Sequence, residues 1–427
     1  MDSPQRALLE ALYRAAVAAA HPANCLPPHL PPPPARGRLI VLAAGKAAGS
    51  MTQIAEERYA EALPRERLGG LAVTRHGYGR PTRFIPVIEA GHPFPDAAGI
   101  SATKRVLKLA DAIDTNDLVL VLLSGGASAN WIAPAAGLTL ELKQAVTRAL
   151  MRSGAPIGEL NTVRKHLSRI KGGRLAQHAH PAKVVTLAIS DVPGDDPAVI
   201  GSGPTVPDPT TLADARAIVA RYRLELPAPV TSALDDPQNE TPKPGDKVFA
   251  AASYRIVARP ALALQAAANH ARAHGYECVM LGDLQGEARE VAAEHAALAR
   301  KLKSQGRRAA ILSGGELTVT LRGQGRGGPN QEYALALAVA LDGVPGIAGL
   351  AGDTDGTDGG SGRADDPAGA FVDATSLTRA RAAGLDPAAF LADNDSTGFF
   401  NGIGDLLRTG PTFTNVTDFR AVIVDSP

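Results

Sequence analysis

The sequence of 427 residues is poor in aromatic side chains and carries almost no net charge. Phe, Trp and Tyr make up 4% of the residues, which disfavours a surface that stacks nucleic-acid bases. The 44 basic and 43 acidic residues leave a net charge of +1, so nothing indicates attraction to nucleic acid or to an anionic membrane. No apolar run approaches the roughly 20 residues needed to span a bilayer. We therefore expect neither nucleic acid nor a membrane as a partner.

Cysteine is also scarce, and the two cysteines, Cys25 and Cys278, lie far apart and in no metal-ligand spacing. They are interpreted as free thiols of a protein from a reducing compartment. The N-terminal stretch lacks the leucine-rich segment of a signal peptide, so we expect a cytoplasmic protein. A small molecule is the expected partner, and formation of a homodimer is left open.

What the sequence does hold is an alternation of short apolar runs and amphipathic segments, which is typical of α/β proteins. A chain of 427 residues exceeds the usual size of one core, so two domains are expected. Proline recurs between residues 224 and 246, and we place the boundary there, giving domains 1–238 and 239–427. The second is expected to begin with a strand at 247–251. The prediction is two Rossmann-like α/β lobes with an active-site cleft between them.

The stretch that begins at Leu118 organises the rest of the chain. Its six apolar residues predict a strand buried on both faces, and Ser124, Gly125, Gly126 and Ser128 lie in the turn that follows. Glycines at a strand end let backbone N–H groups approach a ligand, so this turn is a candidate anion cradle. The pattern recurs after 309–312, in Ser313, Gly314, Gly315 and Glu316. The alternative for each turn is an ordinary junction between a strand and a helix.

Two charged residues follow other predicted strands. Lys46 lies between a strand end and a helix start, where the helix dipole and the lysine both favour a phosphate. Asp191 ends a buried strand, and two more carboxylates, Asp195 and Asp196, follow it. Such a group can hold Mg²⁺ or act as a base. The alternatives are a surface lysine near a helix start and an Asx-type cap on a loop.

A glycine-rich loop at 323–328 formally satisfies the G-x-G-x-x-G pattern of dinucleotide-binding folds. Arg326 inside the loop suits a phosphate as well as a pyrophosphate. The next acidic strand end, Asp353, lies farther along the chain than the roughly 20 residues expected of that fingerprint. Asp353 and Asp355 are candidates for binding Mg²⁺ or a substrate hydroxyl, and the alternative is a solvated acidic turn.

Several longer motifs resemble those of one known family. The N-terminal half resembles class II glycerate 2-kinases and the C-terminal part, at about 308–420, resembles their MOFRL domain. The resemblance covers nearly the whole chain, in order. Its motifs are Leu118–Ser128, Asn161–Gly173, Ser190–Asp195, Gly201–Pro204, Gly327–Glu332, Asp355–Gly359 and Thr409–Val416. One departure is Asn130-Trp131, where similar sequences more often carry an aliphatic pair.

The resemblance implies a kinase that uses ATP and Mg²⁺ to phosphorylate the 2-hydroxyl of (R)-glycerate, giving 2-phosphoglycerate and ADP. It assigns catalysis to Lys46, Asp191 and Arg326, and leaves open whether Asp191 is a base or a metal ligand beside Asp353 and Asp355. Further binding residues in the matching motifs are Asn161, Lys165 and Asn330. The alternative function is an NAD(P)-dependent hydroxypyruvate reductase, which rests on the glycine-rich loop.

Overall fold

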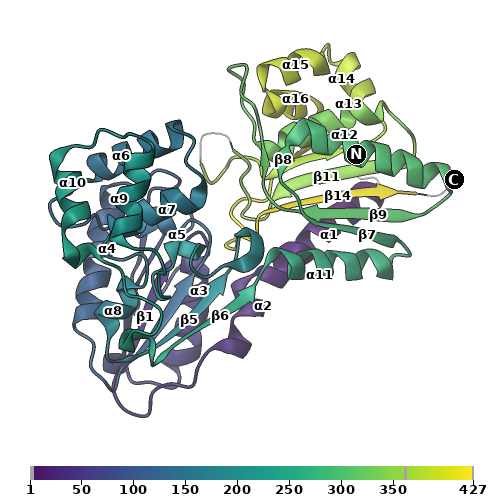
Figure 1. Cartoon of the computed structure of the whole chain (residues 1–427). Helices are drawn as coiled ribbons and strands as arrows, with labels where there is room; N and C mark the ends of the chain where they lie inside the picture. The colour runs from purple at the N-terminus through teal and green to yellow at the C-terminus, as the bar shows by residue number, and fades with distance from the viewer. Residues whose placement is uncertain (1–3, 360–362, 426–427) are drawn as a thin grey trace. The chain divides into compact units, whose positions relative to one another are not determined.

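The computed structural model describes residues 4–359 and 363–425, which form two compact units (Figure 1). The N-terminal lobe comprises residues 26–188 and 194–257. The C-terminal lobe comprises the described residues up to 25, the short segment 189–193, and those from 258 onward. This grouping reflects packing and is discontinuous along the chain, whereas the contiguous domains 1–238 and 239–427 stay a prediction.

The N-terminal lobe is built on a six-stranded sheet with the order β3-β2-β1-β4-β5-β6. The pairs β1–β2, β1–β4, β2–β3 and β4–β5 are parallel, which is the arrangement expected of a Rossmann-like lobe. Every residue of β1 and β4 is buried, as the continuous apolar runs predict. The strands are β1 (Leu39–Ala44), β2 (Leu68–Arg75), β3 (Val87–Ala90), β4 (Leu118–Leu123), β5 (Lys183–Ile189) and β6 (Ala252–Ala258).

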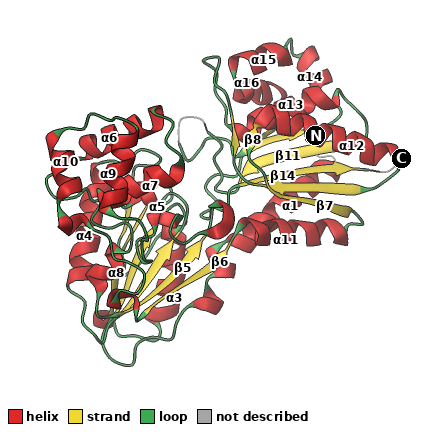
Figure 2. Cartoon of the chain, in the orientation of Figure 1, coloured by secondary structure: helices red, strands yellow, loops and turns green. Residues whose placement is uncertain are grey.

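Helices cover this sheet, and some of them form a second apolar core of their own (Figure 2). The helices are α3 (Ala48–Ala60), α4 (Ala97–Asp111), α5 (Ala127–Asn130), α6 (Leu140–Arg152), α7 (Ile157–His166), α8 (Arg174–Ala179), α9 (Leu212–Arg221) and α10 (Ala228–Asp235). Buried residues of α6, α7, α9 and α10 pack together in the second core. Helix α10 lies inside the proline-rich segment 224–246, so that segment is packed within the lobe. It is not the open linker that its composition suggested.

The prediction of a strand at 247–251 is wrong, both in where the strand begins and in the sheet to which it belongs. Residues Lys247–Phe249 form a turn of 3-10 helix, and β6 begins at Ala252 and completes the first sheet. The second sheet therefore starts with β7.

The C-terminal lobe contains a mixed six-stranded sheet with the order β13-β12-β11-β14-β9-β7. Strands β7 and β9 are parallel, but β14, from the end of the chain, pairs antiparallel with both β9 and β11. The α/β class is confirmed, and the departure from an all-parallel lobe comes from β14 and from β12, which pairs antiparallel with both β11 and β13. The strands are β7 (Glu277–Asp283), β9 (Ala309–Gly314), β11 (Ile347–Asp353), β12 (Gly369–Val372), β13 (Leu406–Leu407) and β14 (Asp418–Val424). A separate pair consists of β8 (Gly286–Glu287) and β10 (Leu317–Thr318).

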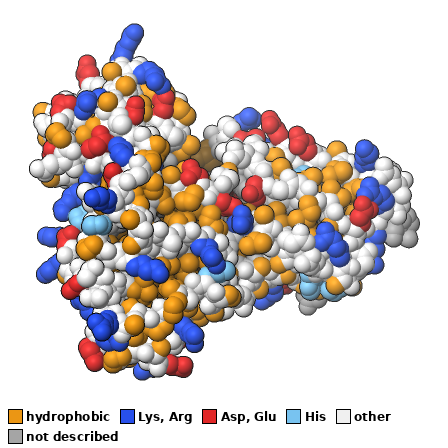
Figure 3. Space-filling model, turned by 60° about the horizontal axis from the view of Figure 1, so that its bottom comes forward, with side chains coloured by type: hydrophobic (Ala, Val, Ile, Leu, Met, Phe, Trp, Pro, Cys, Tyr) orange, Lys and Arg blue, Asp and Glu red, His pale blue; other side chains and the backbone are white. Residues whose placement is uncertain are grey.

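Helices lie on both faces of this sheet, with α1 and α11 on one face and α12 and α13 on the other (Figure 1). They are α1 (Pro4–Ala20), α2 (Pro22–Cys25), α11 (Pro260–Ala273), α12 (Ala288–Ser304), α13 (Pro329–Leu341), α14 (Ser376–Ala382), α15 (Pro387–Asp393) and α16 (Ser396–Ile403). None of the helices in the described part of the chain is long and apolar enough to cross a bilayer. On the face shown in Figure 3, basic and acidic side chains are scattered over both lobes, in keeping with the balanced composition.

The first helix of the chain belongs to the C-terminal lobe. Leu9, Leu12 and Ala16 recur on one face of α1 and are buried, as their helical spacing requires. This helix packs against α11, and the hydroxyl of Tyr13 donates a 2.7 Å hydrogen bond to the carbonyl oxygen of Asp353. The N-terminus thus helps to hold the acidic turn that follows β11.

We predict that Leu12→Ala destabilises the C-terminal lobe by about 2–5 kcal/mol, because it leaves a cavity under a fully buried side chain. Hydrogen exchange followed by mass spectrometry should show lost protection in α11 and β7 but not in β1 or β4. Arg14→Ala, at an exposed position of the same helix, is the matched control and should leave all four elements unchanged. Equal loss of protection in β4 would contradict the assignment of α1 to the C-terminal lobe.

Candidate active site

The carboxyl ends of β1 and β4 lie side by side in the N-terminal lobe. The two strands pair in parallel from Leu39 opposite Leu118 to Ala44 opposite Leu123. After β1 the next strand along the chain, β2, lies on one side of this pair. After β4 the next strand, β5, lies on the other side, so the direction of strand addition changes between β1 and β4. Open α/β sheets bind their ligands at such a change of direction. The turns that carry Lys46 and Ser124 both emerge at this point.

Hydrogen bonds join these two turns. The backbone N–H of Lys46 donates to the carbonyl oxygen of Gly125 (2.8 Å), and the N–H of Ala47 donates to Oγ of Ser124 (2.9 Å). Gly45 has a φ of +116°, and a Cβ atom there would collide with Ser124, so only glycine fits between the turns. The buried Ser124 hydroxyl therefore links the turns, while the half-buried Lys46 stands just before the start of α3.

The other binding residues predicted for this lobe are largely buried within it. Asn161 and Lys165 lie on α7, and Nζ of Lys165 is 3.5 Å from Oδ1 of Asp208. Asn130, from the unusual Asn130-Trp131 pair, is fully buried and donates a 3.3 Å hydrogen bond to the carbonyl oxygen of Gly91. All three side chains are thus largely enclosed by their own lobe.

Asp191 follows β5 and belongs to the C-terminal lobe, not to the lobe that carries Lys46. Nδ2 of Asn415 donates a 2.8 Å hydrogen bond to Oδ2 of Asp191. The segment that carries Asn415 is fixed to the acidic turn, because the N–H of Val416 donates to Oγ1 of Thr354 (2.9 Å) and that hydroxyl donates to the carbonyl of Thr417 (2.6 Å). Within this lobe the structure therefore links Asp191 to the turn that contains Asp353 and Asp355.

The carboxylates of the acidic turn shape its backbone. Oδ1 of Asp353 accepts the N–H of Asp355 (2.9 Å), and Oδ1 of Asp355 accepts the N–H of Thr357 (2.8 Å). No group of three or more His, Cys, Asp or Glu side chains is arranged to hold a metal within 4–359 and 363–425. Mg²⁺ in phosphoryl-transfer sites needs only one or two protein carboxylates, because water and phosphate oxygens complete its coordination. The oxygen donors present fit that kind of partial site.

The glycine-rich loop packs against its own lobe. Cβ atoms on Gly323, Gly325 and Gly328 would collide with Asp393, Asp395 and Asp358, respectively. The preceding strand, β10, has two residues and pairs with β8 in a separate two-stranded sheet, so the loop does not follow a strand of the six-stranded sheet. The glycines are explained by close packing, which removes the structural basis for a dinucleotide fingerprint.

Arg326 is exposed on this loop and its backbone is fixed at both ends. Its N–H donates to Oδ1 of Asp395 (3.2 Å), and its carbonyl oxygen accepts the N–H of Thr397 (2.9 Å). The loop thus presents a guanidinium from a rigid backbone, in the same lobe as Asp191.

Comparison with known proteins identifies the family. A model described as a domain of unknown function (DUF4147) matches residues 8–235, and the MOFRL family model matches residues 309–418. The D-glycerate 2-kinase of Thermotoga maritima is 39% identical over 387 residues, which cover 89% of each chain. The chain belongs to the MOFRL-containing family of glycerate 2-kinases. The crystal structure of glycerate kinase from the same organism matches this glycerate 2-kinase fold with a TM-score of 0.86 at 38% identity, over 98% of this chain and 99% of its own.

Another relative of this glycerate 2-kinase family member has a different name. A protein of Agrobacterium vitis, provisionally named hydroxypyruvate reductase, is 48% identical over 430 residues, covering 99% of this chain and 95% of its own. That name agrees with the alternative drawn from the glycine-rich loop, whose packing gives it no support.

The second Ser-Gly-Gly turn is hydrogen-bonded to side chains of the last strand and of the residue before it. Arg420 is fully buried, and Nη2 donates to the carbonyl oxygens of Gly314 and of Gly315, the latter at 3.1 Å. The N–H of Gly315 donates to Oγ1 of Thr417 (3.3 Å), and Glu316 is exposed. These contacts fix the backbone of the turn, and a binding role for Gly314, Gly315 and Glu316 stays a prediction.

Sequence reasoning missed several buried cations, and two of them bear on the turns described above. One is Arg420, whose alternation with Asp418 along β14 places both side chains on one face. The other is Lys171, whose Nζ donates a 2.8 Å hydrogen bond to the carbonyl oxygen of Ser128. Burial holds the pKa of Lys171 well below its usual range. The available signal was the run of basic residues between Asn161 and Gly173.

Asn330 lies in a buried polar network at the start of α13. Its Nδ2 donates to Oδ1 of Asp418 (2.6 Å) and to Oδ1 of Asp358 (3.1 Å). The N–H groups of Asn330 and Gln331 also donate to the Asp358 carboxylate, so Asp358 caps the helix. Burial raises the pKa of Asp358 to about 7, with the charge of Asp418 adding to the shift and these donors opposing it. Asn330 is thus placed inside the lobe and supports the loop before α13.

The raised pKa of Asp358 predicts a pH-dependent stability of the C-terminal lobe. The unfolded carboxyl loses its proton near pH 4 and the folded one near pH 7, so the free energy of unfolding should fall as the pH rises between these values. The slope should be at most about 1.4 kcal/mol per pH unit. Urea unfolding at pH 5 and pH 7 measures it, and Asp358→Asn should flatten the slope while lowering stability through the weakened cap.

Asp365→Asn is the control for this measurement, since Asp365 is exposed and its pKa is held low by Arg363, so it stays ionised across this range. It should leave the slope unchanged. A parent lobe that becomes more stable from pH 5 to pH 7, with no change of slope in Asp358→Asn, would refute the prediction.

Proposed function

We propose that this protein transfers the γ-phosphoryl group of ATP to the 2-hydroxyl of (R)-glycerate, giving 2-phosphoglycerate and ADP. Family membership supports the proposal, because the matched relative of T. maritima is named D-glycerate 2-kinase. The structural observation that carries it is the pair of joined turns after β1 and β4, with Lys46 at the change of direction in the sheet.

Phosphoryl transfer requires positioning and charge neutralisation, with little covalent work by the protein. Lys46 supplies a positive charge next to the first turn of α3, a helix of 13 residues whose N-terminus carries partial positive charge. Arg326 supplies a planar fork of N–H donors that suits phosphoryl oxygens. We propose that these two cations neutralise the transferring group, and that the turn at 124–128 contacts the substrate carboxylate or a phosphate.

Asp191 is proposed to orient or deprotonate the attacking hydroxyl, or to hold Mg²⁺ together with Asp353 and Asp355. The hydrogen bond from Asn415 to Oδ2 fixes the direction of the carboxylate, which either role needs. Mg²⁺ bound with ATP supplies neutralisation of the phosphate oxygens.

The first test of the proposal is the reaction itself, followed by phosphorus NMR of ATP and (R)-glycerate with the purified protein. The expected product is 2-phosphoglycerate, and NADH or NADPH should not be consumed with hydroxypyruvate. Lys46→Ala and Arg326→Ala should each lower kcat by roughly 10²–10⁴, since each removes a cation facing transition-state charge.

Matched controls are Lys104→Ala and Arg322→Ala, which remove exposed cations from α4 and from the same loop as Arg326. Both should keep kcat near that of the parent. Oxidation of NADH without phosphoryl transfer would overturn the proposal, and near-normal turnover in folded Lys46→Ala and Arg326→Ala would overturn the assignment of the residues.

The Asp191→Asn variant distinguishes the two proposed roles of this carboxylate, because asparagine keeps the size of the aspartate side chain and loses its charge. If Asp191 holds Mg²⁺, raised Mg²⁺ should partly restore kcat. If it is the base, added metal should have no effect, and the acidic limb of the pH–rate profile should disappear. Unchanged kcat at all Mg²⁺ concentrations would show that Asp191 has neither role.

A further inference from the structure

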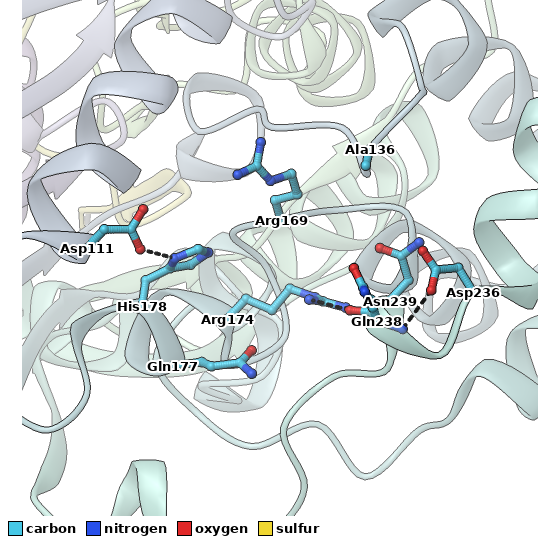
Figure 4. Close-up of a pocket in the computed structure, with 9 residues that line it drawn as sticks. All are labelled: Asp111, Ala136, Arg169, Arg174, Gln177, His178, Asp236, Gln238 and Asn239. Atoms are coloured by element: carbon cyan, nitrogen blue, oxygen red, sulfur yellow. Dashed lines mark hydrogen bonds and ion pairs between the residues drawn. The ribbon is translucent and has the colours of Figure 1, made fainter.

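A polar cavity of about 400 Å³ lies in the N-terminal lobe (Figure 4). Its walls come from the end of α4, the segment before α8, α8 itself and the stretch after α10. None of its lining residues belongs to the turns after β1 and β4. The volume falls within the range of small-molecule sites. The residues that bear on its chemistry are Asp111, Arg169, Arg174, His178, Asp236 and Gln238.

The cavity has two arginines in different environments. Arg169 is exposed, and its guanidinium makes no hydrogen bond or ion pair with any residue that the structure describes. Arg174 is 8% exposed, and its terminal nitrogens donate to the carbonyl oxygens of Gln238 (3.3 Å) and Glu240 (3.2 Å). Figure 4 shows the Arg169 side chain apart from the others and Arg174 extended toward Gln238. Within the described part of the chain, the Arg169 guanidinium is thus a cation without a protein partner.

The acidic side chains of the cavity are already engaged. Oδ1 of Asp111 is 2.6 Å from Nδ1 of His178, and Oδ1 of Asp236 accepts the N–H of Gln238 (2.9 Å). The charge of Arg174 is offset by Glu240, Asp208 and Asp236 nearby. What the cavity lacks is an acceptor for the five N–H donors of Arg169.

We propose that this cavity binds a small organic oxyanion carrying a phosphate or carboxylate group, with Arg169 as its principal contact. A guanidinium can hold either group through two parallel hydrogen bonds. The imidazole of His178, on α8, adds a polar ring nitrogen to the lining of the cavity, and its other nitrogen is oriented by Asp111. The site is separate from the proposed phosphoryl-transfer residues and does not depend on that activity.

Isothermal titration calorimetry tests this with three probes: inorganic phosphate, 2-phosphoglycerate and glycerate. The measurements use the Lys46→Ala protein, so that binding at the proposed active site is weakened. Binding of at least one probe is expected, and which of them binds distinguishes a phosphate from a carboxylate ligand. Arg169→Gln should weaken that binding at least tenfold, and Arg169→Lys should weaken it less because a point charge remains.

Arg152→Gln is the matched control, since Arg152 is an exposed arginine at the end of α6 in the same lobe. It should leave the affinity unchanged. Absence of binding by all three probes would overturn the proposal. Equal affinity in the Arg169→Gln and Arg152→Gln proteins would overturn it as well, because binding would then lie elsewhere. Neither result would bear on the kinase assay, which is carried out with Lys46 present.

Discussion

The in-register pairing of β1 with β4 is the constraint on which the N-terminal lobe depends. It places Gly45 against Ser124, and the contact is so close that no side chain fits at position 45. Because the two strands lead away in opposite directions across the sheet, the same pairing leaves their carboxyl ends uncovered by a crossover helix. A lysine and a run of backbone amides then meet, and the Ser124 hydroxyl joins their two turns. The site is a consequence of strand order.

The C-terminal lobe depends on a buried polar network. Arg420 pairs with Asp418 (3.1 Å) and also holds the carbonyl oxygens of the turn after β9, while Asn330 joins Asp418 to the cap of α13. Removing one member of such a network leaves a buried charge without its partner, which costs far more than the pair contributes. The glycine-rich loop and the acidic turn are therefore held by the same group of side chains.

Much of the fold could be predicted, because the strongest signals in the sequence come from residues that lie close together along the chain. The apolar run from Leu118 marked a buried strand, and the structure buries every residue of β4. Antiparallel insertion of β14 and the docking of α1 could not be predicted, because both rest on pairing between distant segments. Composition also misled at 224–246, where proline lies at the start of a packed helix instead of in a linker.

The candidate site could also be predicted only where its signals are local in the sequence. Lys46 and the turn after β4 were found because strand ends and glycines are visible in the sequence. Burial could not be predicted in the same way, and the structure buries Ser124 and Lys165. Lys171 and Arg420 were missed because nothing local distinguishes a buried cation from a solvated one.

The position of α1 has a consequence for how the chain is made. Its apolar face packs on α11, and the roughly 240 residues between the two helices take on the order of tens of seconds to synthesise at roughly 5–20 residues per second. Every strand of the N-terminal lobe is translated within that interval. The nascent chain thus carries an amphipathic helix whose partner does not yet exist. The lobe that contains α1 is therefore completed only after the N-terminal lobe has been synthesised.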